Sequence, residues 1–258
     1  MRASTFILSA LGSSVFAAPT FPDLNVAAAL PGGIDTVAEY FNLLASKVQA
    51  SKILTQAPVC DLSKASLPAA PTPLPPPTAG LYLKHVALGR GTQNYTCDLK
   101  NATAVPVANG AVATLFNASC LASTYPDLAS SLSRAAIQFN LTENESKLAP
   151  SNLGVSGLHY FTTTTTPFFN LDVSQNLKLG EAQCNKTNNT PAPANAAKGQ
   201  KGEPAVPWLK LVAKVGASGG LQEVYRVETA GGSAPASCKG LTPTFEVQYA
   251  AQYWFFAK

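Results

Sequence analysis

The chain has 258 residues, of which 46% are hydrophobic and only 12% charged, and its formal net charge is +4. This apolar composition excludes a disordered chain, and the length suits one large domain or two small ones. Lysines and arginines are scattered singly along the chain. The basic patch of a nucleic-acid-binding protein is therefore missing, and we expect no nucleic-acid partner.

The N-terminus has the features of a secretory signal peptide. Arg2 gives a charged start, residues 6–16 form a short apolar core, and residues 15–17 resemble a small-residue cleavage site. The core is too short to span a membrane, and no later stretch reaches about 18 uninterrupted apolar residues. We therefore expect residues 1–17 to be removed and the mature protein to be secreted, without a transmembrane segment.

Asn-X-Ser/Thr sequons agree with secretion, because each marks a surface position if it is glycosylated. The sequons lie at Asn94, Asn101, Asn117, Asn140, Asn144, Asn185 and Asn188.

The five cysteines suit a compartment in which disulfides persist, and their odd number leaves one thiol without an intramolecular partner. The sequence alone does not fix the pairing. The arrangement that we expect is Cys97 with Cys120, joining neighbouring strands, and Cys60 with Cys238, tying the N-terminal arm to a late turn. Cys184, in a polar stretch beside two sequons, is then the free thiol.

Residues 18–79 are interpreted as an N-terminal helix followed by an arm. Residues 33–51 have a capping box at 36–39 and apolar residues at helical spacing, which favours a helix that covers the β core over one that binds a partner. Residues 67–78 are dense in proline and should run extended. Because a strand is expected directly after them, we interpret them as an arm lying over the β domain rather than as a linker.

Residues 80–258 have the pattern of an antiparallel β-sandwich or barrel with one or two covering helices. Short β-prone runs alternate with turn-forming residues, and residues 125–139 have helical character. We expect residues 89–91 to form a hairpin turn and residues 185–203 to form an exposed, mobile loop. The expected strands before that loop lie at 80–88, 92–99, 111–118, 158–162, 168–173 and 177–181.

The last part of the chain, residues 205–256, is predicted to form a three-stranded meander. Residues 216–220 form its first turn and are not a dinucleotide motif, because no helix follows them. In the final strand, period-two alternation places residues such as Tyr249 and Tyr253 on one face and Trp254 on the other.

Few residues point to a particular chemistry. The two histidines, His85 and His159, have no companion ligand motif, so we expect neither a metal nor a cofactor. No nucleophile elbow or phosphate loop occurs, and no paired carboxylates favour glycoside hydrolysis. The remaining candidates are aromatic and amphipathic residues of the predicted strands. Such residues either fill the core or line an apolar cavity that contains a few polar groups.

A series of motifs, in order along residues 80–256, resembles a known family. The motifs are GxGTQNYTC from Gly89, GAVAxL from Gly110, GxHYF from Gly157, AVPWLKL from Ala205, VYRVETAGG from Val224 and YAAQYWFF from Tyr249. They resemble a family of secreted, mostly fungal proteins that is filed as a domain of unknown function and often mislabelled malate dehydrogenase. That label has no support here, because the chain lacks a dinucleotide fingerprint and a helix-alternating pattern.

The resemblance implies a hetero-Diels–Alderase of tropolone-sesquiterpene biosynthesis, a branch of secondary metabolism. Such an enzyme forms a quinone methide from a hydroxymethyl tropolone and directs its cycloaddition to a humulene-type sesquiterpene. The reaction needs an apolar pocket for its small-molecule substrates, a hydrogen-bond donor for the heterodiene oxygen, and an acid or base for the loss of water.

Residue type and predicted strand position suggest candidates for these roles. The candidates are His159 or Tyr160 for proton transfer, Lys210 or Arg226 as the oxygen donor, and Trp208, Tyr225 and Trp254 as pocket walls. Two other functions stay open. One is a non-catalytic secreted glycoprotein that binds small apolar ligands or the cell surface. The other is a carbohydrate-active enzyme, which would need carboxylates facing each other across a cleft.

Overall fold

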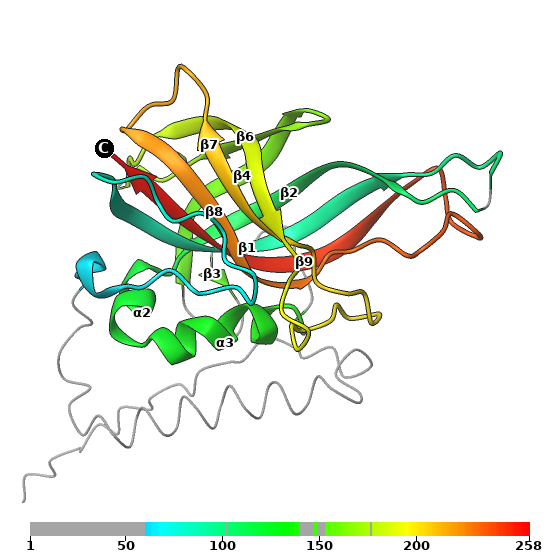
Figure 1. Cartoon of the computed structure of the whole chain (residues 1–258), viewed down its shortest axis with the longest axis horizontal. Helices are drawn as coiled ribbons and strands as arrows, with labels where there is room; N and C mark the ends of the chain where they lie inside the picture. The colour runs from blue at the N-terminus through cyan, green and yellow to red at the C-terminus, as the bar shows by residue number, and fades with distance from the viewer. Residues whose placement is uncertain (1–59, 102, 140–146, 149–152, 176) are drawn as a thin grey trace, which may run out of the picture.

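The computed structural model describes residues 60–101, 103–139, 147–148, 153–175 and 177–258 (Figure 1). Within these residues, eight strands close into an antiparallel barrel, and two α-helices lie against its outer wall. The prediction of a mainly β fold with covering helices is thus confirmed. The predicted signal peptide at 1–17, the predicted helix at 33–51 and the sequons at Asn140 and Asn144 lie outside the described residues.

The barrel strands follow one another around the wall in chain order. They are β1 (Tyr82–Thr96), β2 (Val107–Asn117), β4 (Leu153–Thr163), β5 (Thr166–Asn170), β6 (Glu181–Thr190), β7 (Trp208–Ala213), β8 (Leu221–Gly231) and β9 (Thr244–Ala257). Pairing of β9 with β1 closes the barrel, and a two-residue strand, β3 (Lys147–Leu148), pairs with β4 beside it. This up-and-down closure leaves none of the eight strands with an unpaired edge.

The helices occupy the connection between β2 and β4. α2 (Ser119–Thr124) and α3 (Pro126–Ala136) lie against one side of the barrel, and the short 3₁₀ helix η1 (Leu62–Lys64) contacts α2 (Figure 1). Pro126 begins α3, a position where its missing N–H costs no hydrogen bond. The helix buries Leu128 and Leu132 on one face, as the helical spacing predicted.

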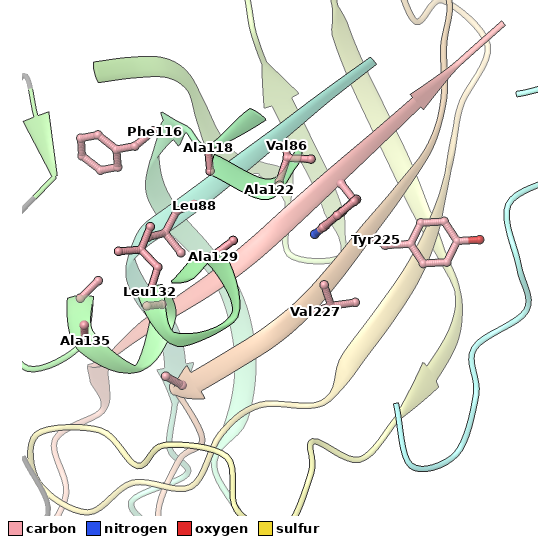
Figure 2. Close-up of a cluster of buried hydrophobic side chains, with 14 of the residues drawn as sticks. Val86, Leu88, Phe116, Ala118, Ala122, Ala129, Leu132, Ala135, Tyr225 and Val227 are labelled. Carbon is pink, nitrogen blue, oxygen red and sulfur yellow. The ribbon is translucent and has the colours of Figure 1, made fainter. Parts of the chain in front are cut away.

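Strand alternation divides the apolar residues between two cores. Along β9, Tyr253 and Phe255 point into the barrel, whereas Trp254 and Phe256 point outward. The predicted two-faced final strand is therefore confirmed. The outer core lies between the barrel wall and the helices, and Figure 2 shows many of its side chains.

The proline-dense segment crosses the outer face of β7 and β8. The Tyr225 hydroxyl donates to the Pro75 carbonyl at 2.8 Å, and Lys210 Nζ donates to the Pro76 carbonyl at 2.8 Å. Figure 2 shows the Tyr225 hydroxyl directed toward this segment. The Thr78 hydroxyl donates to Glu223 at 2.6 Å. We call residues 65–81 the arm.

Three local predictions were wrong. Residues 89–91 are not a turn but lie within the continuous strand β1, which pairs with β9 through Gly89 and Gly91. Residues 177–180 are not in a strand, and β6 instead extends from Glu181 into the predicted mobile loop as far as Thr190. β6 is rich in Asn, Thr and Lys, and it forms a strand because barrel closure supplies hydrogen-bonding partners on both sides.

The predicted disulfide pairing was also wrong. The bonds are Cys60–Cys120 and Cys97–Cys238. Cys120 is in the first turn of α2 on the outer wall, where the residues before the arm also lie. Cys97 follows β1 and therefore lies beside the segment leading into β9. Cys184 is free, as expected, but it is buried in β6 rather than placed in a polar loop, and burial raises the pKa of its thiol to about 12.

Candidate functional site

One end of the barrel interior contains a cavity of about 440 Å³. Its walls are mainly apolar, and its rim includes Thr164 and Thr165 of the β4–β5 turn. The other end of the interior is filled by side chains such as Leu221 and Phe255, which are completely buried. The apolar lining comes chiefly from Phe161, Phe169, Pro167, Leu209 and Leu211, and the polar lining from Gln93, His159, Arg226 and Tyr253.

Small residues on β1 and β2 give the cavity its shape. A Cβ atom at Gly89 would lie 2.5 Å from the Tyr253 ring, and one at Gly91 would lie 2.8 Å from the Cβ of Ala113. Because these positions have no side chain, the tyrosine rings of β9 lie directly against β1. Tyr253 thus forms the floor of the cavity, and its hydroxyl is 2.9 Å from that of Tyr249.

Arg226 is the buried cation of the cavity. It lies on the inward face of β8, and 9% of its surface is exposed. Its Nη2 donates to the Pro207 carbonyl at 2.9 Å, while its Nε has no hydrogen-bond partner among the described residues. The guanidinium therefore retains donor capacity beside the cavity.

His159 lies on β4 with its ring stacked on Phe169, at a centroid distance of 4.3 Å. Its Nδ1 is 2.9 Å from the Phe168 carbonyl, which can only accept, so Nδ1 carries the proton and Nε2 is the acceptor. Burial lowers the pKa of His159 to about 4, and the charge of Arg226 contributes to that lowering. The ring is therefore neutral at pH 7.

The tyrosines near Arg226 are also neutral. Burial raises the pKa of Tyr249 and of Tyr253, and the charge of Arg226 opposes that rise without reversing it. Burial likewise raises the pKa of Tyr95, whose hydroxyl donates to the Gly232 carbonyl. These phenols supply hydrogen bonds but no negative charge to the arginine.

The structure brings only two of the seven predicted site residues to this cavity, His159 and Arg226. Tyr160 follows His159 on the same strand and so faces the opposite way, outside the barrel, where 37% of it is exposed. The other four, Trp208, Lys210, Tyr225 and Trp254, lie on the outer face of β7, β8 and β9. Adjacent strand residues such as Tyr225 and Arg226 cannot line one cavity, because successive side chains point to opposite faces.

The outward residues have other environments. Lys210 forms a salt bridge with Glu223 at 3.1 Å beneath the arm. Trp208 borders a separate hollow of about 260 Å³ between α3 and residues 193–197, and Trp254 borders one of about 230 Å³ between α3 and the arm. None of these groups reaches the barrel interior.

Sequence reasoning missed the apolar lining and two of the four residues named above as its polar lining, Gln93 and Tyr253, although the signal for each of these two was present. Tyr253 shares the alternation of Tyr249 on the final strand. Gln93 alternates with Gly91 and Tyr95 on β1, but the interpretation of residues 89–91 as a turn interrupted that strand and concealed the pattern.

Together, these features define a class of protein: a closed up-and-down β-barrel whose open end holds a mainly apolar cavity with one buried cation. Residues 77–257 match the family model described as "Protein of unknown function (DUF3455)", and the chain belongs to this family. No curated protein and no solved structure gives a significant match. No helix among the described residues has the length and apolar character needed to cross a membrane.

Proposed function

We propose that this protein is a secreted hetero-Diels–Alderase that binds its substrates in the barrel cavity. The observation that carries the proposal is an apolar cavity whose buried polar groups are one arginine with donor capacity and a few neutral side chains. Its volume of about 440 Å³ is in the usual range of small-molecule sites. The resemblance to the fungal family supplies the reaction, and exposed sequons such as Asn101, Asn185 and Asn188 support secretion and glycosylation.

The proposed reaction has two steps. A hydroxymethyl tropolone loses water: the proton that leaves the enol oxygen balances the hydroxide that leaves the hydroxymethyl carbon, and a quinone methide remains. The quinone methide then adds to an alkene of a humulene-type sesquiterpene, forming one C–O and one C–C bond without loss of atoms. The second step depends mainly on holding both partners near their attack geometry, and an apolar cavity can supply this.

The cavity residues have matching roles. Arg226 donates to the oxygen of the heterodiene, where negative charge increases during the cycloaddition. His159, neutral and with Nε2 as its acceptor, receives a hydrogen bond from the hydroxymethyl group and so orients it for loss of water. The stacked rings of Phe169 and His159 and the ring of Tyr253 provide flat apolar surfaces for the substrates.

The alternative is a secreted protein that binds a small apolar ligand without catalysis. The low pKa of His159 favours it, because a group with a pKa of about 4 is a weak base at neutral pH. In this alternative, the same cavity and the same arginine recognise a ligand that leaves unchanged.

The test uses the secreted protein with a hydroxymethyl tropolone and a humulene-type alcohol, against a control without protein. The measured quantities are the rate of adduct formation and its stereochemistry. Leu209→Trp fills the cavity and should abolish catalysis. The matched control is Val212→Trp, on the same strand but facing outward, which should retain it. Arg226→Gln should lower the rate by roughly 10²-fold or more.

The outcomes separate the functions. Accelerated, stereoselective adduct formation that is lost in Leu209→Trp but kept in Val212→Trp supports the enzyme. Substrate binding that Leu209→Trp blocks, without acceleration, supports the binding protein. If the protein neither accelerates the reaction nor binds the substrates, both proposed functions are wrong.

A further inference from the structure

Among the described residues, three lysine or arginine side chains are buried on strands, and the charge of two of them is matched by partners. Lys210 pairs with the Glu223 carboxylate. Arg90 donates to the carbonyl oxygens of Gly91, Ala136, Phe139 and Tyr249 and to the side-chain oxygen of Gln248. The fold therefore supplies negative charge or several carbonyl dipoles where a cation is buried, as the cost of burying charge requires.

Arg226 is the exception. One carbonyl accepts a hydrogen bond from its Nη2 and the neutral Tyr253 hydroxyl is a second partner, but its Nε is unpartnered, and no carboxylate among the described residues forms an ion pair with it. Its neighbours do not compensate the charge either, because the raised pKa values of Tyr95, Tyr249 and Tyr253 keep these phenols protonated. A buried guanidinium left in this state is complementary to an anion from outside the chain.

The other lining residues of the cavity also favour an anionic ligand. Its second cation is Lys186, exposed on β6, and none of its lining residues is acidic. Most of the remaining lining is apolar, with residues such as Phe161 and Leu211. A ligand that satisfies both parts has an apolar body and one negatively charged oxygen group.

We propose that the cavity selects ligands in their deprotonated form, as carboxylates or acidic enols, by pairing the anionic oxygens with Arg226, while Lys186 at the mouth attracts the anion. The inference rests on the proposed use of the cavity for small molecules and narrows the class of ligand. The planar fork of an arginine suits two oxygens on adjacent or shared carbons, an arrangement common to carboxylates and to the enolates of 2-hydroxyketones.

The test uses the fluorescent reporter N-phenyl-1-naphthylamine, which is neutral, and two competitors of the same shape. These are 2-naphthoate, which is anionic at pH 7.5, and 2-naphthalenemethanol, which is neutral. We expect 2-naphthoate to displace the reporter from the wild-type protein at a concentration at least about tenfold lower than the alcohol. Arg226→Gln should remove that preference, which is measured as the ratio of the two competitor affinities so that any change in reporter affinity cancels. Lys186→Gln should reduce the preference a few-fold, and the exposed Lys100→Gln should not change it.

Each outcome decides a separate point. A reporter that does not bind, or that binds equally to Leu209→Trp, contradicts the proposed function. If the reporter binds in the cavity but both competitors displace it at the same concentration, the inference about charge is wrong and the proposed function still stands. If circular dichroism shows that Arg226→Gln does not fold, Arg226→Lys replaces it. This variant keeps the charge and loses the fork, so a reduced but remaining preference for 2-naphthoate is expected, and an unchanged preference would contradict the role of the fork.

Discussion

Two buried histidines occupy different parts of the barrel interior, and their hydrogen bonds distinguish them. His85 has both ring nitrogens within 2.9 Å of serine hydroxyls, those of Ser119 and Ser156. His159 has a protein partner only at Nδ1 among the described residues. The hydrogen bonds of His85 are therefore complete without a ligand, whereas Nε2 of His159 can accept a hydrogen bond from a ligand in the cavity.

Both histidines should make the fold sensitive to acid. Burial lowers the pKa of each to about 4 from an unfolded value near 6.5. Between these values the unfolded chain binds more protons, so the contribution of the two histidines to the free energy of unfolding should fall as the pH falls from 6.5 to 4 and be constant above 6.5. Each shift corresponds to roughly 3 kcal/mol. Urea denaturation at pH 7.5 and 4.5 measures the fall.

Substitution of each histidine tests whether the two rings cause this fall in the free energy of unfolding. His159→Gln should lose about half of the pH dependence, and the double variant with His85→Gln most of it. A wild-type stability that does not change between pH 6.5 and 4.5 would contradict the buried, neutral state of both rings.

Arg90 secures the C-terminal end of α3. Its Nε donates to the Ala136 carbonyl at 3.2 Å and its Nη2 to the Phe139 carbonyl at 3.1 Å, so the buried guanidinium lies against the partial negative charge at the end of the helix. Arg90→Met should lower the free energy of unfolding by about 3 kcal/mol, measured by chemical denaturation. Arg134→Gln, on the same helix but more exposed, serves as the control and should cost less than about 1 kcal/mol. Equal effects of the two would contradict this role.

At the scale of elements, β1 depends on glycine at an inward position rather than at a turn. A Cβ at Gly91 would lie 1.9 Å from the Val112 carbonyl oxygen, so Gly91→Ala forces β1 and β2 apart. We expect a loss of about 2–3 kcal/mol or more in stability. Gly154→Ala on β4 is the matched control, because its Cβ would meet no atom within 4 Å. Similar melting temperatures for the two variants would show that the strands are not closely packed at Gly91.

The arm is held to β7 and β8 by a buried ion pair. Burial alone would raise the pKa of Glu223, but hydrogen bonds from Thr78 and Lys210 lower it, so the carboxylate stays charged beside Lys210. Glu223→Gln leaves Lys210 without its counter-charge and should cost roughly 3–5 kcal/mol. The arm should then be cleaved faster by a protease.

The control for this prediction is the exposed pair of Lys64 and Asp61, at 3.8 Å, where Lys64→Gln should have no measurable effect. The double variant Lys210→Met/Glu223→Gln should recover part of the lost stability, because it no longer buries an unpaired charge. If Glu223→Gln leaves the cleavage rate unchanged, the ion pair does not hold the arm.

The elements that could be predicted were those whose signal is local. Alternation along β9 and the helical spacing of α3 each depend on one stretch of sequence. β6 could not be found in this way, because its polar residues have no apolar period and only its neighbours in the closed barrel make it a strand. The site shows the same limit. His159 and Arg226 were found by residue type, but their separation from Lys210 and Trp208 depends on which face is inside, and this was known only from the closed barrel.

At the scale of the whole molecule, Cys97–Cys238 lies beside the seam where β1 meets β9, and it joins residues 141 positions apart. Replacing both cysteines by serine should lower the free energy of unfolding by about 2–5 kcal/mol, because the unfolded chain loses a long cross-link. Chemical denaturation measures the loss. Wild-type protein under reducing conditions, which also opens Cys60–Cys120, should lose at least as much, and a smaller loss there would contradict the assignment.

The closing of the barrel by its first and last strands has a consequence for synthesis. β1 is made first of the eight barrel strands, whereas its partner β9 is made last of the eight. Until then, β1 and β8 each lack a neighbour, and their unpaired backbone groups can pair with other chains. The barrel can therefore close only after β9 has been translated. Closure also depends on contacts between distant parts of the sequence, and such contacts form slowly. Such a chain is most prone to aggregate between the synthesis of β1 and the closure of the barrel by β9. Molecular chaperones would be most effective during this interval.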